Sequence, residues 1–305
     1  MTGVQTCALP ISVLFNEVPD FPYRDNWFTK DILHELAHIR KSILDLTYDV
    51  QDIRDFLLIT MSSIIRTVSN ADDHCTRTVV RKRLKKEIYP SMALKKFVEA
   101  LIMNTHRINE YSRDLSGNNF VDITENSDAR FIDFPDNNFD LAITSPPYVN
   151  AVDYTRTHQL EIYWLGLAKG SLTPLKQVHV GTEVVKVNDY NNLFNIGDKE
   201  ADKVIEEIFL KDKRRAYIAY KYLYDMKLNL IEVYRTLKPG ARYIIVVGNN
   251  KIKGYLFENW KYLMNIASQI GYKIENYFAS EIIKHFIKVP REERINTDWI
   301  IVLRK

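Results

Sequence analysis

The chain has 305 residues, of which 46% are hydrophobic and 27% charged, and its formal net charge is +3. These values are typical of a soluble globular protein with one large or two ordinary domains. They exclude a protein that binds nucleic acid through a strongly basic overall field. No apolar stretch approaches the ~20 residues of a membrane span, and the two cysteines form neither a disulfide framework nor a metal-ligand cluster. We therefore expect a cytoplasmic protein.

The first eleven residues are unusual. They contain no charged side chain, so they lack the basic segment of a secretory signal. Their sequence resembles the translation of a sequencing adapter joined to a gene fragment. We expect residues 1–11 to be an artefact and the natural gene to begin further upstream.

A helical region is predicted over residues 12–117, because apolar side chains recur at helical spacing over residues 31–46, 49–68 and 93–111. His34, Glu35 and His38 have the spacing of a zinc-binding helix. No third ligand is evident, so the preferred interpretation is a packed helix without metal.

The most basic part of the chain covers residues 77–96, which we expect to be largely helical. A basic helix can neutralise the phosphates of a nucleic-acid backbone, although a solvated surface is an equally good interpretation. The candidate phosphate-binding residues are Arg81, Lys82, Arg83, Lys85 and Lys86.

The sequence pattern of residues 118–305 predicts an α/β region. Short apolar runs predict strands at 120–123, 141–144, 242–248, 272–283 and 299–303, and helical patterns cover 150–166, 198–237 and the residues up to Gly271. The last two strands are expected to pair as a hairpin. Residues 167–198 are polar and irregular, so they predict either a surface loop or an insert that recognises a target.

The run Leu141–Thr144 predicts a parallel strand buried on both faces. It is followed directly by Ser145, Pro146, Pro147 and Tyr148. Two prolines end the strand pairing and fix two φ angles, which places a rigid polar and aromatic step at the carboxyl end of a strand. Open α/β sheets bind their ligands at this end.

This strand and its Ser-Pro-Pro-Tyr step resemble the catalytic motif of amino-group DNA methyltransferases, and the order of the later strands and helices resembles the end of their sheet. The resemblance implies a class I, Rossmann-like methyltransferase fold with a helical insertion and S-adenosylmethionine as cofactor. It implies that Ser145, Pro146, Pro147 and Tyr148 are catalytic. Ser145 and the Pro146 carbonyl would accept hydrogen bonds from the target amino group, and Tyr148 would stack on a base flipped out of double-stranded DNA.

The resemblance assigns further roles. Asp128 and Thr144 would contact the cofactor, and Arg156 and His158 would contact phosphates. Serine at the first motif position favours cytosine N4 as the target over adenine N6 or an RNA amino group. Methylation at cytosine C5 is not expected, because neither cysteine follows a proline. The natural role would be the modification enzyme of a restriction system, with a restriction endonuclease acting on the same site.

The sequence departs from the family in one respect. The family has a glycine-rich loop for the methionine part of the cofactor, whereas the ten glycines of this chain form no such loop. We therefore expect a chain truncated just after the cofactor loop, with the first strands missing and with weak cofactor binding. A catalytically silent module that binds nucleic acid is the alternative of a different class.

Overall fold

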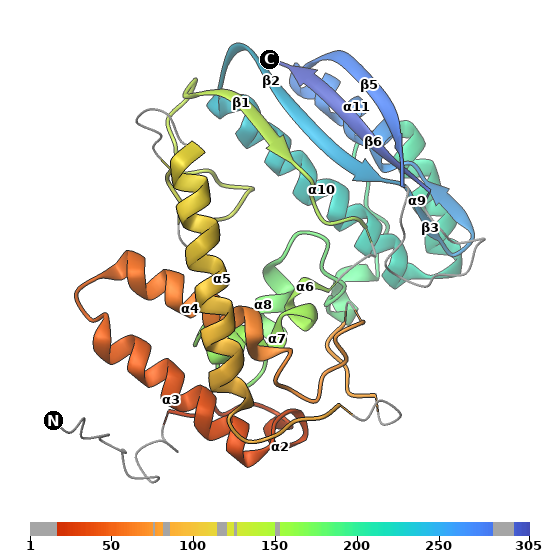
Figure 1. The fold of residues 1–305 in the computed structure, drawn as a ribbon. Coiled ribbons are helices and arrows are strands. Elements are labelled where there is room, and N and C mark those ends of the chain that lie inside the picture. The colour runs from red at the N-terminus through yellow and green to blue at the C-terminus, as the bar shows by residue number, and fades with distance from the viewer. Residues whose placement is uncertain are drawn as a thin grey trace, which may run out of the picture. The chain divides into compact units, whose positions relative to one another are not determined.

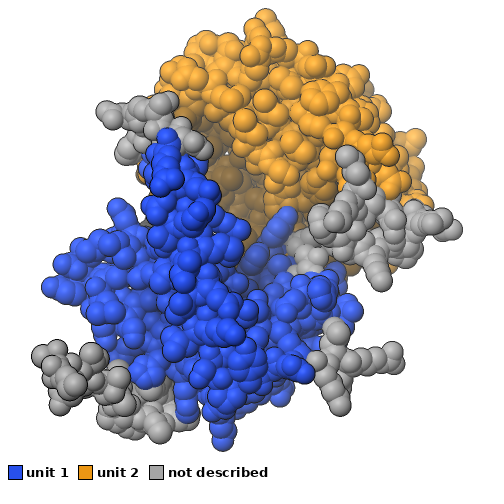
Figure 2. All heavy atoms as spheres, viewed as in Figure 1, with its two compact units in different colours: residues 1–121, 154–172 blue, residues 122–153, 173–305 orange. Residues whose placement is uncertain are grey.

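The computed structural model describes residues 17–75, 77–81, 86–114, 121–124, 127–149, 153–282 and 296–305. The chain divides into two compact units, residues 1–121 with 154–172 and residues 122–153 with 173–305 (Figure 2). This differs from the predicted boundary at residue 117, because residues 154–172 belong to the helical unit.

The first unit is helical, as the periodicity predicted (Figure 1). Its helices are α2 (Arg24–Trp27), α3 (Lys30–Leu46), α4 (Gln51–Ile65), α5 (Met92–Asp114), α6 (Tyr154–Thr157) and α7 (Gln159–Trp164). The helical pattern predicted over residues 150–166 is confirmed for its described part, which forms two short helices, α6 and α7. Gly166 follows α7 with a φ of 74°, a conformation that favours glycine.

Residues of α7 complete the core of the first unit, which explains the position of the boundary. The Trp164 side chain is fully buried and contacts Phe28 edge to face, with 5.9 Å between the ring centroids. Tyr163 stacks on Phe21 at 4.6 Å, and its hydroxyl donates a hydrogen bond of 2.6 Å to the Gly170 carbonyl. Aromatic contacts of this kind add to the free energy of burial.

Glu161 of α7 is a largely buried carboxylic acid whose Oε2 atom has no hydrogen-bond partner among the described residues. Burial raises its pKa above the ordinary value of 4.5, and the nearby charges of His158 and Arg66 oppose this change. The folded state therefore favours the protonated form.

We expect Glu161 to contribute stability to the first unit that is fully present below about pH 4.5, the ordinary pKa of a glutamate, and that is lost as the pH rises through the raised pKa of the folded state. The reason is that folding must then either bind a proton or bury a charge. Carboxylates with lowered pKa values, such as Glu99, change the stability in the opposite direction, so the contribution of Glu161 is measured as a difference between two proteins. With rising pH, the melting temperature of Glu161→Gln should fall less, or rise more, than that of the parent protein, whereas Glu110→Gln, at an exposed position of α5, should follow the parent protein. An identical pH dependence in Glu161→Gln would contradict the assignment.

The second unit contains a mixed sheet of four strands in the order β1-β2-β6-β5 (Figure 1). β1 is parallel to β2, whereas β6 is antiparallel to both β2 and β5. The predicted final hairpin is therefore confirmed, with β6 lying between β2 and β5. The strands are β1 (Phe139–Thr144), β2 (Leu237–Gly248), β5 (Lys273–Glu281) and β6 (Thr297–Arg304).

Helices α10 and α11 cover one face of this sheet (Figure 1). Tyr243, Ile245 and Val247 alternate along β2 and are buried on this face, as the period of a strand requires. The Tyr243 hydroxyl donates a hydrogen bond of 2.6 Å to Asn229 of α10. The helices of this unit are α8 (Thr173–Val178), α9 (Lys199–Lys211), α10 (Lys213–Thr236) and α11 (Asn259–Ile270), with a 3₁₀ turn η1 (Val187–Tyr190).

The other face of β1 is exposed, which contradicts the prediction of a strand buried on both faces. Leu141 is 49% exposed and Ile143 is 65% exposed. Alternate residues of β1 point to the side covered by helices, and on the opposite side no described element buries Leu141 or Ile143. An apolar run identifies a strand, but it does not show that both faces are covered.

One further prediction is wrong, and two features of the structure were not predicted. The segment predicted to be helical over 198–237 is helical, but it forms two helices, because Asp212 ends α9 and its side chain caps the first turn of α10. The strand predicted at 120–123 is wrong for residues 121–123, which are described without regular structure. A small hairpin of β3 (Asn250–Ile252) and β4 (Tyr255–Phe257) was not predicted. Lys253 and Gly254 both have positive φ between these strands, as a tight hairpin turn requires.

Candidate functional site

Ser145, Pro146, Pro147 and Tyr148 follow β1 directly, at its carboxyl end. Because β1 and β2 are parallel, the end of β2 lies at the same edge of the sheet. β6 is antiparallel to β2 and pairs Asp298 with Gly248, so its first residues lie at this edge too. The sheet thus brings three segments from distant parts of the sequence to the carboxyl end of the parallel strands, which we call the carboxyl edge of the sheet.

Two of the contacts that Tyr148 makes with described residues help to fix it at this edge. Its hydroxyl donates a hydrogen bond of 2.7 Å to Oδ1 of Asp298. Its ring lies against Gly248 so closely that a Cβ atom at position 248 would be 2.7 Å from Cε2 of Tyr148 and 3.2 Å from Oδ1 of Asp298. Only glycine leaves room for the aromatic ring in this position.

The end of β2 is itself held by Asn259, a fully buried residue at the start of α11. Its Nδ2 atom donates hydrogen bonds to the Gly248 carbonyl (2.7 Å) and to Oδ1 of Asn250 (2.9 Å). The Oδ1 atoms of Asn249 and Asn259 are buried, and no partner for them exists among the described residues. A buried acceptor without a partner costs free energy in a protein interior. Each of these two oxygens can therefore accept a further hydrogen bond at this edge.

Part of the predicted insert at 167–198 lies against the motif. Gly181 has a φ of 77°, and a Cβ atom there would be 3.4 Å from Cβ of Pro147. Polar contacts hold this loop to the rest of the second unit. The Val178 carbonyl accepts a hydrogen bond from Arg130, and Glu183 forms an ion pair of 2.9 Å with Arg215. The Ser-Pro-Pro-Tyr step is therefore packed against this loop as well as against the end of β2.

Asp128, predicted to contact a cofactor, is part of an ion-pair network. Arg130 pairs with Asp128 at 2.6 Å and with Asp225 at 2.9 Å, and Lys221 pairs with Asp225 at 2.5 Å. The hydrogen bonds from Arg130 hold the pKa of Asp128 below its ordinary value. Asp225 is only 2% exposed, so the network joins the segment before β1 to the interior of α10.

The basic run is arranged differently from the prediction. Residues 77–81 and 86–91 are not helical, and α5 begins only at Met92. Arg81 forms an ion pair of 3.0 Å with Asp72, whereas Lys86 pairs with Asp73 and also donates to two backbone carbonyls. These partners engage both charges in the fold of the first unit. Lys82, Arg83 and Lys85 lie outside the described residues.

Arg156 and His158 are exposed on α6 and at the residue preceding α7. They belong to the first unit, whereas the Ser-Pro-Pro-Tyr step belongs to the second. In the second unit Ser145 is exposed and Thr144 is half-buried.

Glu35, which lies between the two histidines of α3, has a structural role. Glu35 accepts hydrogen bonds from the backbone N–H groups of Ser91 and Ala93, at 2.5 and 2.8 Å, and so caps the start of α5. Over the described ranges, no three side chains of the metal-binding types form a group that could hold an ion.

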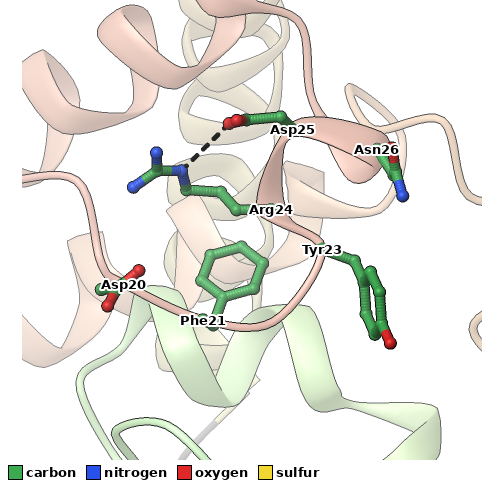
Figure 3. A pocket seen from close by; sticks show the side chains of 6 residues that line it. All are labelled: Asp20, Phe21, Tyr23, Arg24, Asp25 and Asn26. Carbon is green, nitrogen blue, oxygen red and sulfur yellow. Dashed lines mark hydrogen bonds and ion pairs between the residues drawn. The ribbon is translucent and has the colours of Figure 1, made fainter.

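A hollow of about 340 Å³ lies at α2 in the first unit (Figure 3). Arg24 and Asp25 form an ion pair of 3.2 Å beside it. No motif of the sequence falls there, and we assign it no role. The residues that line it are Asp20, Phe21, Tyr23, Arg24, Asp25 and Asn26.

Sequence reasoning missed Gly248, Asn259 and Asp298. A signal existed for the first, because the strand 242–248 ends in small and polar residues. None existed for Asp298, which is 150 positions from Tyr148 in the sequence.

The chemistry that this edge can perform follows from its groups. A hydroxyl and a proline carbonyl are acceptors, and a fixed aromatic ring offers a flat apolar surface. These groups suit a planar heterocycle that carries hydrogen-bond donors on its edge. Among the described helices, none is long and apolar enough to cross a bilayer.

The chain has sequence similarity to proteins of known name. No protein-family model matches the chain. It is similar in sequence to the type II methyltransferase M.MvaI of Kocuria varians, with 26% identity over 252 residues, which are 78% of this chain and 55% of that protein. The type II methyltransferase M.AvaI of Nostoc sp. is 29% identical over 157 residues, which are 47% of this chain and 33% of that protein. The chain is thus homologous to type II methyltransferases and spans about a third to a half of their length.

Likeness to solved structures is weak. A putative DNA modification methylase from Thermus thermophilus, solved in complex with S-adenosyl-L-methionine, has 20% sequence identity and a TM-score of 0.32. The match covers 58% of this chain and 53% of that chain.

Proposed function

We propose that this chain belongs to an enzyme that transfers a methyl group to an exocyclic amino group of a DNA base, and that the chain holds that base. The observation that carries the proposal is the fixed position of Tyr148 beside Ser145 and Pro146 at the carboxyl edge of the sheet. The sequence similarity to type II methyltransferases supports it.

The reaction explains why these groups are needed. An exocyclic amino group is a poor nucleophile, because its lone pair is delocalised into the ring. Ser145 Oγ and the Pro146 carbonyl accept hydrogen bonds from its two hydrogens, so that the nitrogen becomes tetrahedral and its lone pair is available for attack. The groups act by position and electrostatics, without a covalent intermediate.

The base must leave the duplex to reach this edge. Unstacking costs about a few kcal/mol, and stacking on an aromatic side chain offsets part of it. Tyr148 has this function in our proposal, and Pro147 keeps the step rigid.

Arg156 and His158 remain candidate contacts to the phosphates of DNA. The residues of the basic run are weaker candidates, because Arg81 and Lys86 already have acidic partners. These residues are Arg81, Lys82, Arg83, Lys85 and Lys86.

The methyl donor in this proposal is S-adenosylmethionine, with Thr144 and Asp128 as candidate contacts. The fit is incomplete. The Asp128 carboxylate already accepts hydrogen bonds from Arg130, and the sequence has no glycine-rich loop for the methionine part. We therefore derive no step through the donor from the residues of this chain.

The target base is cytosine N4 in our proposal, since serine opens the motif, and the enzyme modifies the site of a cognate restriction endonuclease. Methylome sequencing of a host that expresses the encoding gene tests the target base and gives the sequence in which it is modified. We expect N4-methylcytosine within one short sequence. Ser145→Ala should lower the rate of methyl transfer by at least about a hundredfold, because a preorganised acceptor is removed. Ser268→Ala, an exposed serine of α11, is the matched control.

The outcomes separate the alternatives. N6-methyladenine in place of N4-methylcytosine would correct the target base and keep the reaction class. A genome without methylated bases would overturn the proposal. If the purified chain then still bound DNA, a non-catalytic nucleic-acid-binding module would be the better description.

A further inference from the structure

We infer that Asp298 is a positioning residue, which acts on the target base only through the hydroxyl of Tyr148. This inference rests on the proposed function and extends it, because it assigns a role to a residue outside the Ser-Pro-Pro-Tyr step. The structural basis is the 2.7 Å hydrogen bond from Tyr148 to Oδ1 of Asp298.

An aromatic side chain at a strand end has two torsions that must be fixed before it can stack reproducibly on a base. Gly248 restricts the ring on one side by close contact. The hydrogen bond to Asp298 fixes the far end of the ring, where a carboxylate is a stronger acceptor than a neutral group. The two contacts act at opposite ends of the ring, and the side chain also packs against the core of the second unit.

The position of Asp298 is itself well determined. Asp298 pairs with Gly248 in the ladder between β2 and β6, the last pair of that ladder. The Gly248 carbonyl is held by Asn259, which is fully buried. The acceptor and the surface under the ring therefore belong to one rigid part of the sheet, and Tyr148 is attached to that part from the neighbouring strand.

This arrangement also separates the two roles of Tyr148. The ring supplies the surface for stacking, whereas the hydroxyl serves only to orient the ring. Loss of the hydroxyl should therefore have the same effect as loss of its acceptor, and both should be milder than loss of the ring.

The test is a double-mutant cycle of Asp298→Ala and Tyr148→Phe in the protein expressed from its gene. We expect each single substitution to lower kcat for methyl transfer by about tenfold, the typical effect of one charge-assisted hydrogen bond. KM for DNA should change little. The double variant should be no worse than either single variant, and Asp298→Asn, which keeps an acceptor oxygen, should recover most of the activity. Asp140→Ala, which removes a carboxylate from an exposed ion pair with Lys238, should have no effect.

Fluorine NMR of a fluorotyrosine placed at position 148 gives a second measurement that needs no catalysis. We expect one distinct signal in the parent protein and in Asp140→Ala, and an averaged signal shifted towards the unfolded position in Asp298→Ala. An unchanged signal, or additive losses of kcat in the double variant, would overturn the inference. If instead the signal responds as expected but no variant or parent protein transfers methyl groups, the positioning contact stands and the proposed function fails.

Discussion

Replacing Gly248 by alanine is expected to abolish most methyl transfer and to destabilise the second unit. The added Cβ atom would lie 2.7 Å from Cε2 of Tyr148 and 3.2 Å from Oδ1 of Asp298, distances at which the ring must move. Overpacking of this kind costs typically about 1–3 kcal/mol, and displacement of the ring by an ångström lowers the rate by about a hundredfold. Gly248 has an ordinary backbone conformation, so the effect is steric rather than conformational.

A second substitution shows whether the ring is responsible. In Tyr148→Ala the space beside Gly248 is vacated, so Gly248→Ala on that background should add little to the change in the free energy of unfolding. Chemical denaturation of the four proteins measures this coupling, and methyl transfer should stay low in every variant. Equal destabilisation by Gly248→Ala with and without the ring would show that the contact with Tyr148 does not limit the position.

Asp225→Ala is expected to destabilise the second unit by about 3–5 kcal/mol, because it leaves the charges of Arg130 and Lys221 without their shared partner. Asp225 is 2% exposed, and the side chains of Arg130 and Lys221 are only 14% and 23% exposed, so solvent replaces the carboxylate incompletely, although Arg130 keeps its ion pair with Asp128. Denaturant unfolding of the variant against the parent protein measures the loss.

The matched control for Asp225 is Asp140→Ala, which breaks the exposed ion pair between Asp140 and Lys238. Exposed pairs contribute about 0–1 kcal/mol, so the two alanine variants should differ clearly. Asp225→Asn keeps the shape of the side chain and should give an intermediate loss. A loss below about 1 kcal/mol in Asp225→Ala would mean that the network contributes no more than a surface ion pair.

The sequence predicted those parts of the fold that depend on local patterns. The helical periodicity identified α3, α4, α5 and α11, and apolar runs identified β1, β2 and the final hairpin. Ser145–Tyr148 could be found because two prolines after an apolar run are a local signal. Their position at the carboxyl edge then followed from the general behaviour of parallel strands.

The parts that were missed depend on contacts between distant residues. A strand pattern does not reveal which strand lies beside it, so the pairing of Gly248 with Asp298 could not be read from either segment. A helix break without glycine or proline gives no clear signal in the sequence either, and Asp212 between α9 and α10 is an example. Charge runs are ambiguous for a related reason, since Arg81 and Lys86 find acidic partners within the fold.

The two edge strands of the described sheet, β1 and β5, both combine exposed charges with exposed apolar side chains. On β5, Lys273, Glu275 and Glu281 are exposed together with Tyr277 and Phe278, which are 48% and 49% exposed. On β1, Asp140 is exposed beside Leu141 and Ile143. Because charges on an edge strand discourage pairing with another chain, each of these two strands carries a charge that opposes the attraction of its apolar neighbours.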